Sequence, residues 1–332
     1  MAFTSKGYGL AKKIAAIFNT GAYRVSRLRE FVPDVFKKGN TLVFVGSAGI
    51  AVRAIAPLVK DKTADPAVVV VDELGRYVIP ILSGHIGGAN AFAEKVGGLI
   101  GAAPVITTAT DINNIFSVDT YAKKNRYAIA NPENIKYISA ALLEGKEVGL
   151  CTQFEISGKL PDNIVPKPDG DVGILIADSR DTVGGFSYEK TLALMPKRFH
   201  VGIGARKNIA YDLLHDYFLE TLDKASIPAM CVGSISSIDL KKDEQAIIKL
   251  AETYGIGFLT YSAEQLKIYE HKFIQSDFVR KTTGVGNVCE PSAYISSKEG
   301  EIIVGKRTNG GMAIAVAREI WRVVFENIDD GA

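Results

Sequence analysis

The segment Ser83-Gly-His85-Ile-Gly-Gly88-Ala-Asn90 contains the side chains and peptide groups best suited to chemistry. Histidine titrates near neutral pH and can act as a general base. Ser83 and His85 are two residues apart and would share a face of an extended segment. The pattern is not that of a nucleophile elbow, so we expect water as the nucleophile and His85 as its base. A histidine that caps a helix or packs in the core explains the segment equally well.

Main-chain N–H groups in the same segment could stabilise negative charge. Those of Gly87 and Gly88 are the predicted donors to a developing oxyanion. Further along the chain, the Thr107-Thr108-Ala-Thr110-Asp111 run could bind substrate carboxylates or orient a histidine, and Asp111 is a candidate catalytic acid. A polar turn capped by Asp111 is the alternative. Glu290, before Pro291, is a third catalytic candidate or a helix-terminal acid.

Four glycine clusters follow predicted strands: 46–49, 84–88, 202–204 and 284–286. Glycine allows close approach of main-chain N–H groups to a ligand, although a tight turn explains each cluster alone. No cluster completes a dinucleotide fingerprint or a P-loop. Cations near these turns could pair with carboxylates. The candidate substrate-binding residues are Gly46, Gly49, Arg53, Ser83, Gly84, Gly87, Gly88, Asn90, Thr107, Thr108, Gly202, Gly204, Gly284 and Lys306.

Composition excludes several classes of protein. The chain of 332 residues has 39 basic and 37 acidic residues, a net charge of +2, so binding to nucleic acid is not expected. Cys151, Cys231 and Cys289 lack the spacing of a metal site or a disulfide framework. The N-terminus is not a signal peptide, and no apolar run is long enough to span a bilayer. We therefore expect a cytoplasmic protein that does not bind membranes.

Alternation of strands and helices predicts an α/β fold with two doubly wound domains and a less regular middle segment. The domains are expected over residues 1–118 and 198–332, with the middle region over 119–197. Ligands in doubly wound sheets bind beyond the carboxyl ends of the strands. The predicted N-terminal elements are strands over 41–45, 67–71, 77–82 and 105–107 and helices over 51–58 and 89–98.

The other two regions give signals of different strength. In the middle region we expect helices over 121–124 and 132–143, strands over 147–154 and 172–177, and a loop over 161–171. The predicted C-terminal strands are 199–204, 230–235, 257–261 and 301–305. The predicted C-terminal helices are 208–225, 243–254, 263–268, 285–293 and 312–328.

Three N-terminal motifs in this order resemble the cobalamin biosynthesis protein G family, the cobalt-precorrin 5A hydrolases. They are Gly49-Ile-Ala-Val-Arg53-Ala-Ile-Ala-Pro57, Leu82-Ser-Gly-His85-Ile-Gly-Gly-Ala-Asn90 and Pro104-Val-Ile-Thr-Thr-Ala-Thr-Asp111. Gly202-Ile-Gly204, Thr283-Gly-Val285 and Val288-Cys-Glu290-Pro291 resemble the last domain of that family. The resemblance covers nearly the whole chain.

The resemblance implies hydrolysis of a lactone on a corrin precursor, followed by release of acetaldehyde, in the anaerobic route to vitamin B12. It implies a corrinoid substrate and no cofactor or metal bound by the protein, because cobalt arrives within the substrate. A homodimer or contact with neighbouring pathway enzymes is a further expectation. Two alternatives stay open: a transferase that binds phosphate or a nucleotide, and a corrin-precursor carrier without catalysis.

Overall fold

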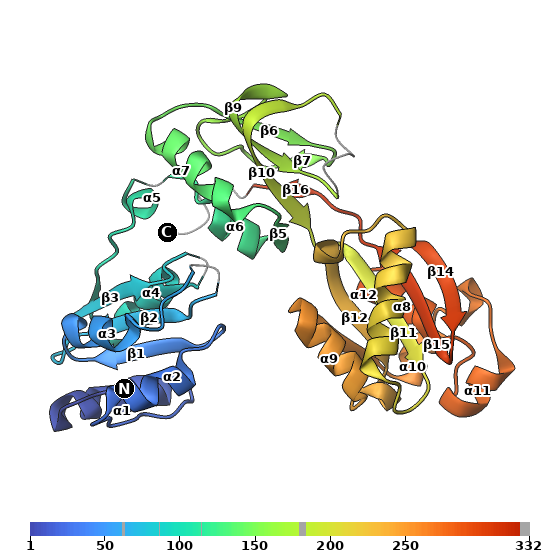
Figure 1. The fold of residues 1–332 in the computed structure, drawn as a ribbon, viewed down its shortest axis with the longest axis horizontal. Helices are drawn as coiled ribbons and strands as arrows, with labels where there is room; N and C mark the ends of the chain where they lie inside the picture. The colour runs from blue at the N-terminus through green and yellow to red at the C-terminus, as the bar shows by residue number, and fades with distance from the viewer. Residues whose placement is uncertain (62–63, 86, 114, 179–183, 326–332) are drawn as a thin grey trace. The chain divides into compact units, whose positions relative to one another are not determined.

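The structure is a computed structural model that describes residues 1–61, 64–85, 87–113, 115–178 and 184–325. The chain divides into two compact units, Met1–Lys123 and Lys124–Ala332 (Figure 1). Helices and strands alternate through both units, which confirms the predicted α/β class. Among the described residues, no helix combines the length and the apolar character needed to cross a membrane.

The N-terminal unit is built on a four-stranded sheet of order β1-β2-β3-β4. Its strands are β1 (Thr41–Val45), β2 (Ala67–Val71), β3 (Tyr77–Leu82) and β4 (Ala103–Pro104). Its helices are α1 (Ser5–Ile17), α2 (Leu28–Val35), α3 (Ala48–Ile55), α4 (Ala89–Ile100), α5 (Ala109–Ile112) and α6 (Val118–Lys124). β2 is parallel to β1 and antiparallel to β3, and β4 is parallel to β3.

The run of four valines in β2 explains the layers of this unit. Every residue of β2 is buried, as expected for a strand covered on both faces. Val69 and Val71 pack with residues of α1 and α4, whereas Val68 and Val70 pack with residues of α2 and α3. Successive side chains of a strand point to opposite faces, so helices cover both sides of the sheet. The strand predicted over 105–107 is wrong in position, because the strand in this part of the chain is β4 at Ala103–Pro104.

The middle region contains a five-stranded sheet of order β5-β10-β9-β6-β8. Its strands are β5 (Tyr127–Ile129), β6 (Val148–Thr152), β8 (Ile164–Pro166), β9 (Asp169–Ile176) and β10 (Ser187–Pro196), and its helices are η1 (Pro132–Asn134) and α7 (Ile135–Leu143). β8, β6, β9 and β10 are parallel, and β5 is antiparallel. The loop predicted over 161–171 is wrong in part, because it contains β8 and the start of β9. A small separate sheet joins β7 (Ile156–Ser157) to β16 (Val323–Val324).

The C-terminal region has a five-stranded sheet of order β13-β12-β11-β15-β14. Its strands are β11 (Phe199–Ala205), β12 (Val232–Ile238), β13 (Gly257–Tyr261), β14 (Glu301–Asn309) and β15 (Met312–Arg318). Its α-helices are α8 (Tyr211–Lys224), α9 (Gln245–Tyr254), α10 (Ala263–Lys267), α11 (Asp277–Thr283) and α12 (Cys289–Ser296), and its 3-10 turns are η3 (Ala229–Cys231), η4 (Asp239–Lys241) and η5 (Glu270–Lys272). β11, β12 and β13 are parallel, and β15 is antiparallel to both β11 and β14.

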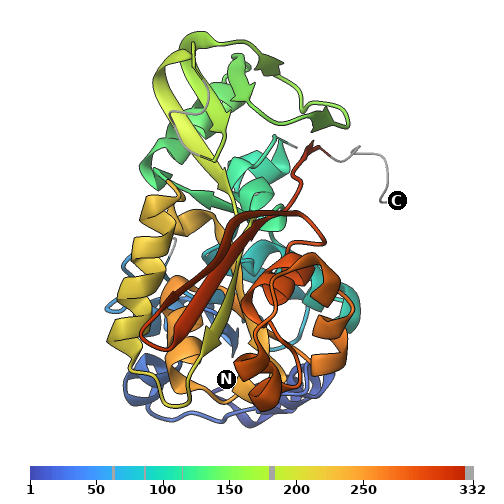
Figure 2. The ribbon, with the colours of Figure 1, turned by 90° about the vertical axis from the view of Figure 1, so that its right-hand side faces the viewer.

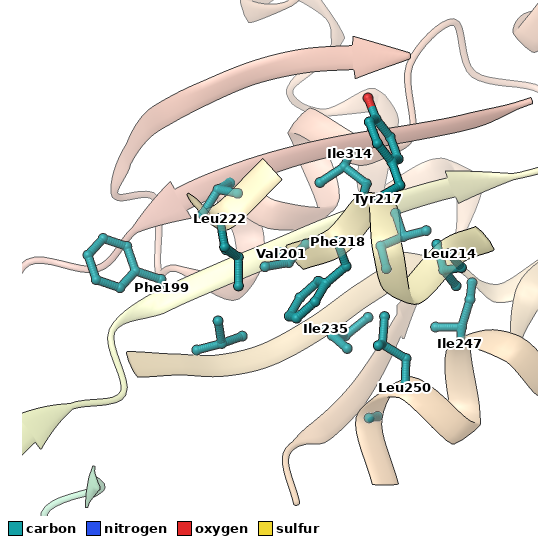
Figure 3. Close-up of a cluster of buried hydrophobic side chains, with 14 of the residues drawn as sticks. Phe199, Val201, Leu214, Tyr217, Phe218, Leu222, Ile235, Ile247, Leu250 and Ile314 are labelled. Carbon is teal, nitrogen blue, oxygen red and sulfur yellow. The ribbon is translucent and has the colours of Figure 1, made fainter. Parts of the chain in front are cut away.

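Large apolar side chains fill one face of this sheet. Val201 and Ile203 of β11 pack against Leu214 and Phe218 of α8, together with Ile314 of β15 (Figure 3). α9 contributes to the same cluster through Ile247 and Leu250. Helices α8 and α12 cover opposite faces of the sheet (Figure 2).

The other face is lined by small residues where α12 crosses it. Gly202 pairs with Ala315 across β11 and β15, and Gly204 pairs with Ala313. A Cβ at Gly202 would lie 1.8 Å from the carbonyl oxygen of Cys289 in α12, so this position requires glycine. The helix predicted over 312–328 is wrong for its described residues, because Met312–Arg318 form β15 and Val323–Val324 form β16, whereas residues 326–328 lie outside the described part of the chain. Alanine favours helices, but here alanines alternate with large apolar residues at the two-residue period of a strand.

Candidate functional site

The segment around His85 folds into a compact turn that leads from β3 to α4. Ser83 has a left-handed backbone with φ of 55°. Main-chain N–H groups of Gly88, Ala89 and Asn90 donate to the carbonyl oxygens of His85, Ser83 and Gly84 at 2.9, 3.1 and 3.1 Å. The Ser83 hydroxyl donates to the carbonyl oxygen of Asp65 at 3.1 Å. The prediction of an extended segment with Ser83 and His85 on one face is therefore wrong.

His85 lies beside a carboxylate that the sequence analysis did not select. Its Nδ1 is 3.5 Å from Oδ1 of Asp119, and the two side chains are 16% and 10% exposed. The hydroxyl of Ser117 also lies 3.5 Å from Nδ1 and donates to the same Asp119 oxygen at 2.7 Å. Asp119 lies at the start of α6, so the beginning of this helix positions an acceptor against the imidazole. A carboxylate at one ring nitrogen orients a histidine whose other nitrogen exchanges protons with substrate.

Asp119 stays ionised over the whole range in which a histidine works. Burial by itself would raise the pKa of this carboxyl group. Hydrogen bonds from His85, Ser117 and the main-chain N–H of Thr120 outweigh burial and lower the pKa to about 2. The pair therefore consists of a fixed anion and an imidazole, an arrangement that stabilises an imidazolium formed during proton transfer.

The glycines of the turn are required by packing. A Cβ at Gly84 would lie 2.7 Å from the side-chain oxygen of Asn90, and one at Gly87 would lie 2.3 Å from Cβ of Ser83. Gly88 has φ of 85° and begins α4 as its N-cap. Its N–H group donates to the carbonyl oxygen of His85, so the predicted oxyanion contact by Gly88 is contradicted. The corresponding role for Gly87 stays a prediction.

The Thr107–Asp111 run contacts the turn through Thr108, and its described members differ in exposure. The side-chain amide of Asn90 donates to the hydroxyl of Thr108 at 3.0 Å, whereas Thr107 is exposed. The backbone of Asp111 belongs to α5, but its side chain lies outside the described residues. At Nδ1 of His85 the structure places Asp119 and Ser117.

Gly46, Gly49 and Arg53 lie at the end of β1 and in α3. Gly46 has φ of 147°, and a Cβ there would approach the ring of Phe3 to 2.9 Å. Gly49 and Arg53 are exposed on α3. Their predicted contacts with substrate stay predictions.

A cavity of about 720 Å³ lies at the carboxyl ends of β11 and β12 in the C-terminal region. The tip of the β14–β15 hairpin, helix α11 and the start of α12 complete its walls. Gly204 and Lys306 line the cavity, and their binding of substrate stays a prediction. Gly202 is buried beneath α12, and Gly284 ends α11 with φ of 79° outside the lining. The conformation of each of these two glycines is explained by local packing or turn geometry.

The cavity lining is basic. Arg206, Lys207, Lys241 and Lys306 line it, and no aspartate or glutamate does so among the described residues. Lys241 pairs with the buried Glu244 at 3.3 Å. A positive lining of this kind favours anionic ligands.

Glu290 lies in α12 and connects this helix to β14. One carboxylate oxygen accepts a hydrogen bond from the main-chain N–H of Lys306 at 3.1 Å. The other accepts from the side-chain amide of Asn287, which is fully buried. This arrangement explains Glu290 as a residue that positions the strand beside the cavity, and its catalytic role stays a prediction.

The cysteines are free, and two of them are buried. Burial raises the pKa of the Cys231 thiol and of the Cys289 thiol, in each case to about 12. Both thiols are therefore protonated near neutral pH and are poor nucleophiles, although Cys289 borders the cavity.

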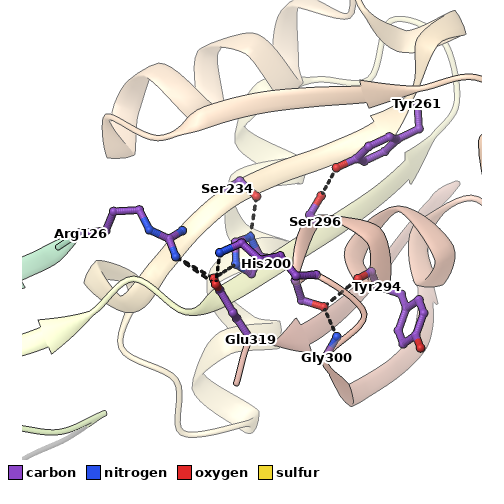
Figure 4. Close-up of polar contacts among 10 residues, drawn as sticks. Arg126, His200, Ser234, Tyr261, Tyr294, Ser296, Gly300 and Glu319 are labelled. Carbon is purple, nitrogen blue, oxygen red and sulfur yellow. Dashed lines mark hydrogen bonds and ion pairs between the residues drawn. The ribbon is translucent and has the colours of Figure 1, made fainter. Parts of the chain in front are cut away.

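A second buried histidine belongs to a structural ion cluster (Figure 4). His200 lies 2.7 Å from the hydroxyl of Ser234 and 3.3 Å from a carboxylate oxygen of Glu319. Arg126 donates to Glu319 at 2.9 and 3.1 Å, and Lys298 donates to it at 2.5 Å. The cluster connects the segment before β5 to the end of β15. His200 therefore has a structural role in this cluster.

The fold and the His85–Asp119 pair define an α/β protein with a histidine–carboxylate site. Residues 30–111 match the family described as Cobalamin synthesis G N-terminal, and residues 116–172 match the Cobalamin biosynthesis central region. Residues 199–317 match Cobalamin synthesis G C-terminus. The chain belongs to this cobalamin biosynthesis G family, which confirms the resemblance seen in its motifs. The predicted domain boundaries near residues 118 and 197 stay predictions.

Relatives with known names extend the match over nearly the full chain. A cobalt-precorrin-5A hydrolase from Salmonella typhimurium is 36% identical over 94% of this chain and 95% of its own length. The enzyme of the same name from Priestia megaterium is 29% identical over 96% of this chain and 93% of its own. Among solved structures, a cobalamin biosynthesis protein G homologue from Sulfolobus solfataricus is 24% identical, with a TM-score of 0.42, over 96% of this chain and 95% of that chain.

Proposed function

We propose that this protein is a cobalt-precorrin-5A hydrolase that opens the substrate lactone and releases acetaldehyde, giving cobalt-precorrin 5B. The observation that carries this proposal is the similarity to the Salmonella typhimurium hydrolase along both chains. The His85–Asp119 pair supplies a group that can perform the first proton transfer. Cobalt enters as part of the substrate, and no cofactor bound by the protein takes part.

In the first step, His85 takes a proton from water while the water oxygen attacks the lactone carbonyl. Asp119 at Nδ1 stabilises the imidazolium that forms, so Nε2 is the atom that receives the proton. The peptide N–H of Gly87 is the proposed donor to the tetrahedral oxyanion. Cleavage of the ester C–O bond leaves the acetate carboxylate of ring A and a hydroxyl group on the former meso carbon, to which the imidazolium proton returns.

In the second step, the new hydroxyl group loses its proton and the carbon–carbon bond to the macrocycle breaks. The bonding electrons pass into the macrocycle, and the former meso carbon leaves with its methyl group as acetaldehyde. One water is consumed for each acetaldehyde released, and no external oxidant or reductant is needed. His85 can accept the hydroxyl proton because the imidazole is neutral again at the end of the first step.

The cellular setting belongs to the same proposal. We expect the protein to act in the cytoplasm, where a corrinoid intermediate passes between enzymes, either as a homodimer or in contact with neighbouring pathway enzymes. These expectations follow from the proposed substrate.

The test is incubation of the purified protein with cobalt-precorrin 5A and measurement of acetaldehyde with a coupled dehydrogenase. Release of one acetaldehyde per substrate, with the matching change in corrinoid mass, supports the proposal. Binding of the corrinoid without acetaldehyde would contradict it and favour a carrier. A shift of the corrinoid mass by one water without acetaldehyde would restrict the activity to lactone opening.

A further inference from the structure

We propose that the cavity between β11, β12, α11 and the β14–β15 hairpin binds the carboxylate side chains of the corrinoid macrocycle. This inference rests on the proposed function for the identity of the ligand. The cavity itself lies wholly within the C-terminal region, and every residue of its lining is described. Its volume of about 720 Å³ falls within the range of about 300–1,000 Å³ typical of small-molecule sites.

The position of the cavity in the sheet is typical of a ligand site. β11 and β12 are parallel, and their carboxyl ends open into the cavity. Ligands of α/β sheets bind at this edge because loops after parallel strands converge there. The hairpin tip approaches from the antiparallel side, where Asn309 pairs with Met312 around the Gly310-Gly311 turn. Both glycines have positive φ, which the tight two-residue turn requires.

The positive charge of the lining favours binding of an anion whose negative charges are spread apart. Arg206, Lys207 and Lys306 have no ion-pair partner among the described residues, and the lining contains no carboxylate. Arg206 is held at its base by the hairpin, since its main-chain N–H donates to the carbonyl oxygen of Gly311 at 2.9 Å. The side chain of Arg206 lies over Gly311, where a Cβ would approach it to 3.1 Å. Cations from the end of β11 and from within β14 therefore face one space, which suits carboxylates spread around a ring.

An apolar wall accompanies these cations. Phe278 of α11 is 80% exposed and lines the cavity together with Val279, Ile238 and Met312. An exposed phenyl ring offers a flat apolar surface that can stack on a planar or nearly planar macrocycle. Small dianions do not need such a wall, whereas a tetrapyrrole presents both an apolar face and a charged rim. The combination therefore favours a tetrapyrrole polycarboxylate over free phosphate.

The binding test uses two stable probes and visible absorbance titration of the full chain. Uroporphyrin III carries carboxylates around a tetrapyrrole, and dicyanocobinamide is a corrinoid whose side chains are mostly amides. Lys306→Gln and Arg206→Gln are each expected to raise the Kd for uroporphyrin by about tenfold, because each removes one charged partner of a carboxylate. The Kd for dicyanocobinamide should change less than twofold. Lys224→Gln, at the end of α8 outside the cavity, is the matched control and should leave both values unchanged.

Phe278→Ser tests the apolar wall separately from the charges. It should raise the Kd for both probes by about fivefold, whereas Phe278→Leu should restore most of the affinity for dicyanocobinamide. Arg206 and Phe278 are exposed, so these changes should leave the thermal midpoint close to that of the unchanged protein.

Uroporphyrin affinity that is the same in Lys306→Gln, Arg206→Gln and the Lys224→Gln control would overturn the inference. Tighter binding of ATP than of uroporphyrin, with displacement of the porphyrin, would overturn it in favour of a nucleotide site.

The acetaldehyde assay separates this inference from the proposed function. If acetaldehyde is released with an unchanged KM in Lys306→Gln, the cavity assignment fails and the hydrolase stands. If the probes bind as expected without acetaldehyde release from cobalt-precorrin 5A, the hydrolase fails and the binding site stands.

Discussion

Oδ1 of Asp119 lies 3.5 Å from Nδ1 of His85, although the two residues come from separate segments of the N-terminal unit. The turn after β3 supplies the imidazole, and the start of α6 supplies the carboxylate. Ser117 bonds to the same carboxylate oxygen and restricts its position. This relationship favours His85 as an oriented base in the proposed reaction, with Asp119 as its positioning residue.

Asp119→Asn should lower kcat for acetaldehyde release by about 10²-fold or more, with little change in KM, because the imidazolium formed in catalysis loses its neighbouring anion. The acidic limb of the kcat/KM profile should move to lower pH for the same reason. Steady-state assays between pH 5 and pH 9 measure both effects. Asp34→Asn, at an exposed position of α2, is the control and should match the unchanged protein. A loss of activity with an unmoved pH profile would assign Asp119 a purely structural role.

Gly202→Ala should destabilise the protein by about 1–3 kcal/mol, since a Cβ there meets the carbonyl oxygen of Cys289 and forces α12 away from β11. Urea unfolding measures the difference. Gly257→Ala in β13 is the matched control, because a Cβ at that position meets nothing within 4 Å. The control should be neutral or slightly more stable. Equal stability of the two variants would contradict the close packing of α12 on the sheet.

Glu319→Gln should cost about 3 kcal/mol at pH 7, because His200, Arg126 and Lys298 lose their shared partner. Glu301→Gln at the surface, which breaks the ion pair with Arg318, should cost less than about 1 kcal/mol. The free energy of unfolding at several pH values gives both numbers. A cost for Glu319→Gln no larger than that of the surface control would show that the cluster contributes little to stability.

The same cluster predicts a pH dependence of stability. Burial alone would raise the pKa of Glu319, but hydrogen bonds from His200, Lys298 and Arg126 lower it to about 2. A carboxyl group whose pKa is lower in the folded state stabilises that state fully above its unfolded pKa near 4 and loses this contribution as pH falls towards 2. The stability difference between the unchanged protein and Glu319→Gln should therefore shrink from pH 5 to pH 2.

Local patterns predicted the strands with the strongest signals. The valine run of β2 is apolar at every position, so its burial on both faces follows from composition alone. β15 shows the limit of this reasoning. Its alanines favour a helix in isolation, and only their pairing with Gly202 and Gly204 beneath α12 explains them as strand residues. Contacts between segments distant in the sequence therefore decide that these residues form a strand.

The candidate site could also be predicted only in part, because some of its contacts join residues that are far apart in the sequence. His85 and its glycine turn could be predicted because they are contiguous in sequence, whereas the close packing at Gly84 and Gly87 is known only from the structure. Asp119 carries no local signal, since an acidic residue at the start of a helix is common for electrostatic reasons. Its meaning depends on the fold, which brings α6 against the turn. The cavity depends on long-range pairing as well, because its cations come from the segments after β11 and β12 and from β14, which are far apart in the sequence.

Acetaldehyde release by His85→Ala, measured with cobalt-precorrin 5A beside the unchanged protein, tests whether the His85 imidazole activates the attacking water. His271→Ala, which changes a histidine in η5 of the C-terminal region, controls for the substitution itself. We predict that His85→Ala loses activity by about 10²-fold or more but still binds the corrinoid, and that His271→Ala has normal activity. Turnover by His85→Ala within a few-fold of the unchanged protein would contradict the claim that this imidazole delivers the attacking water.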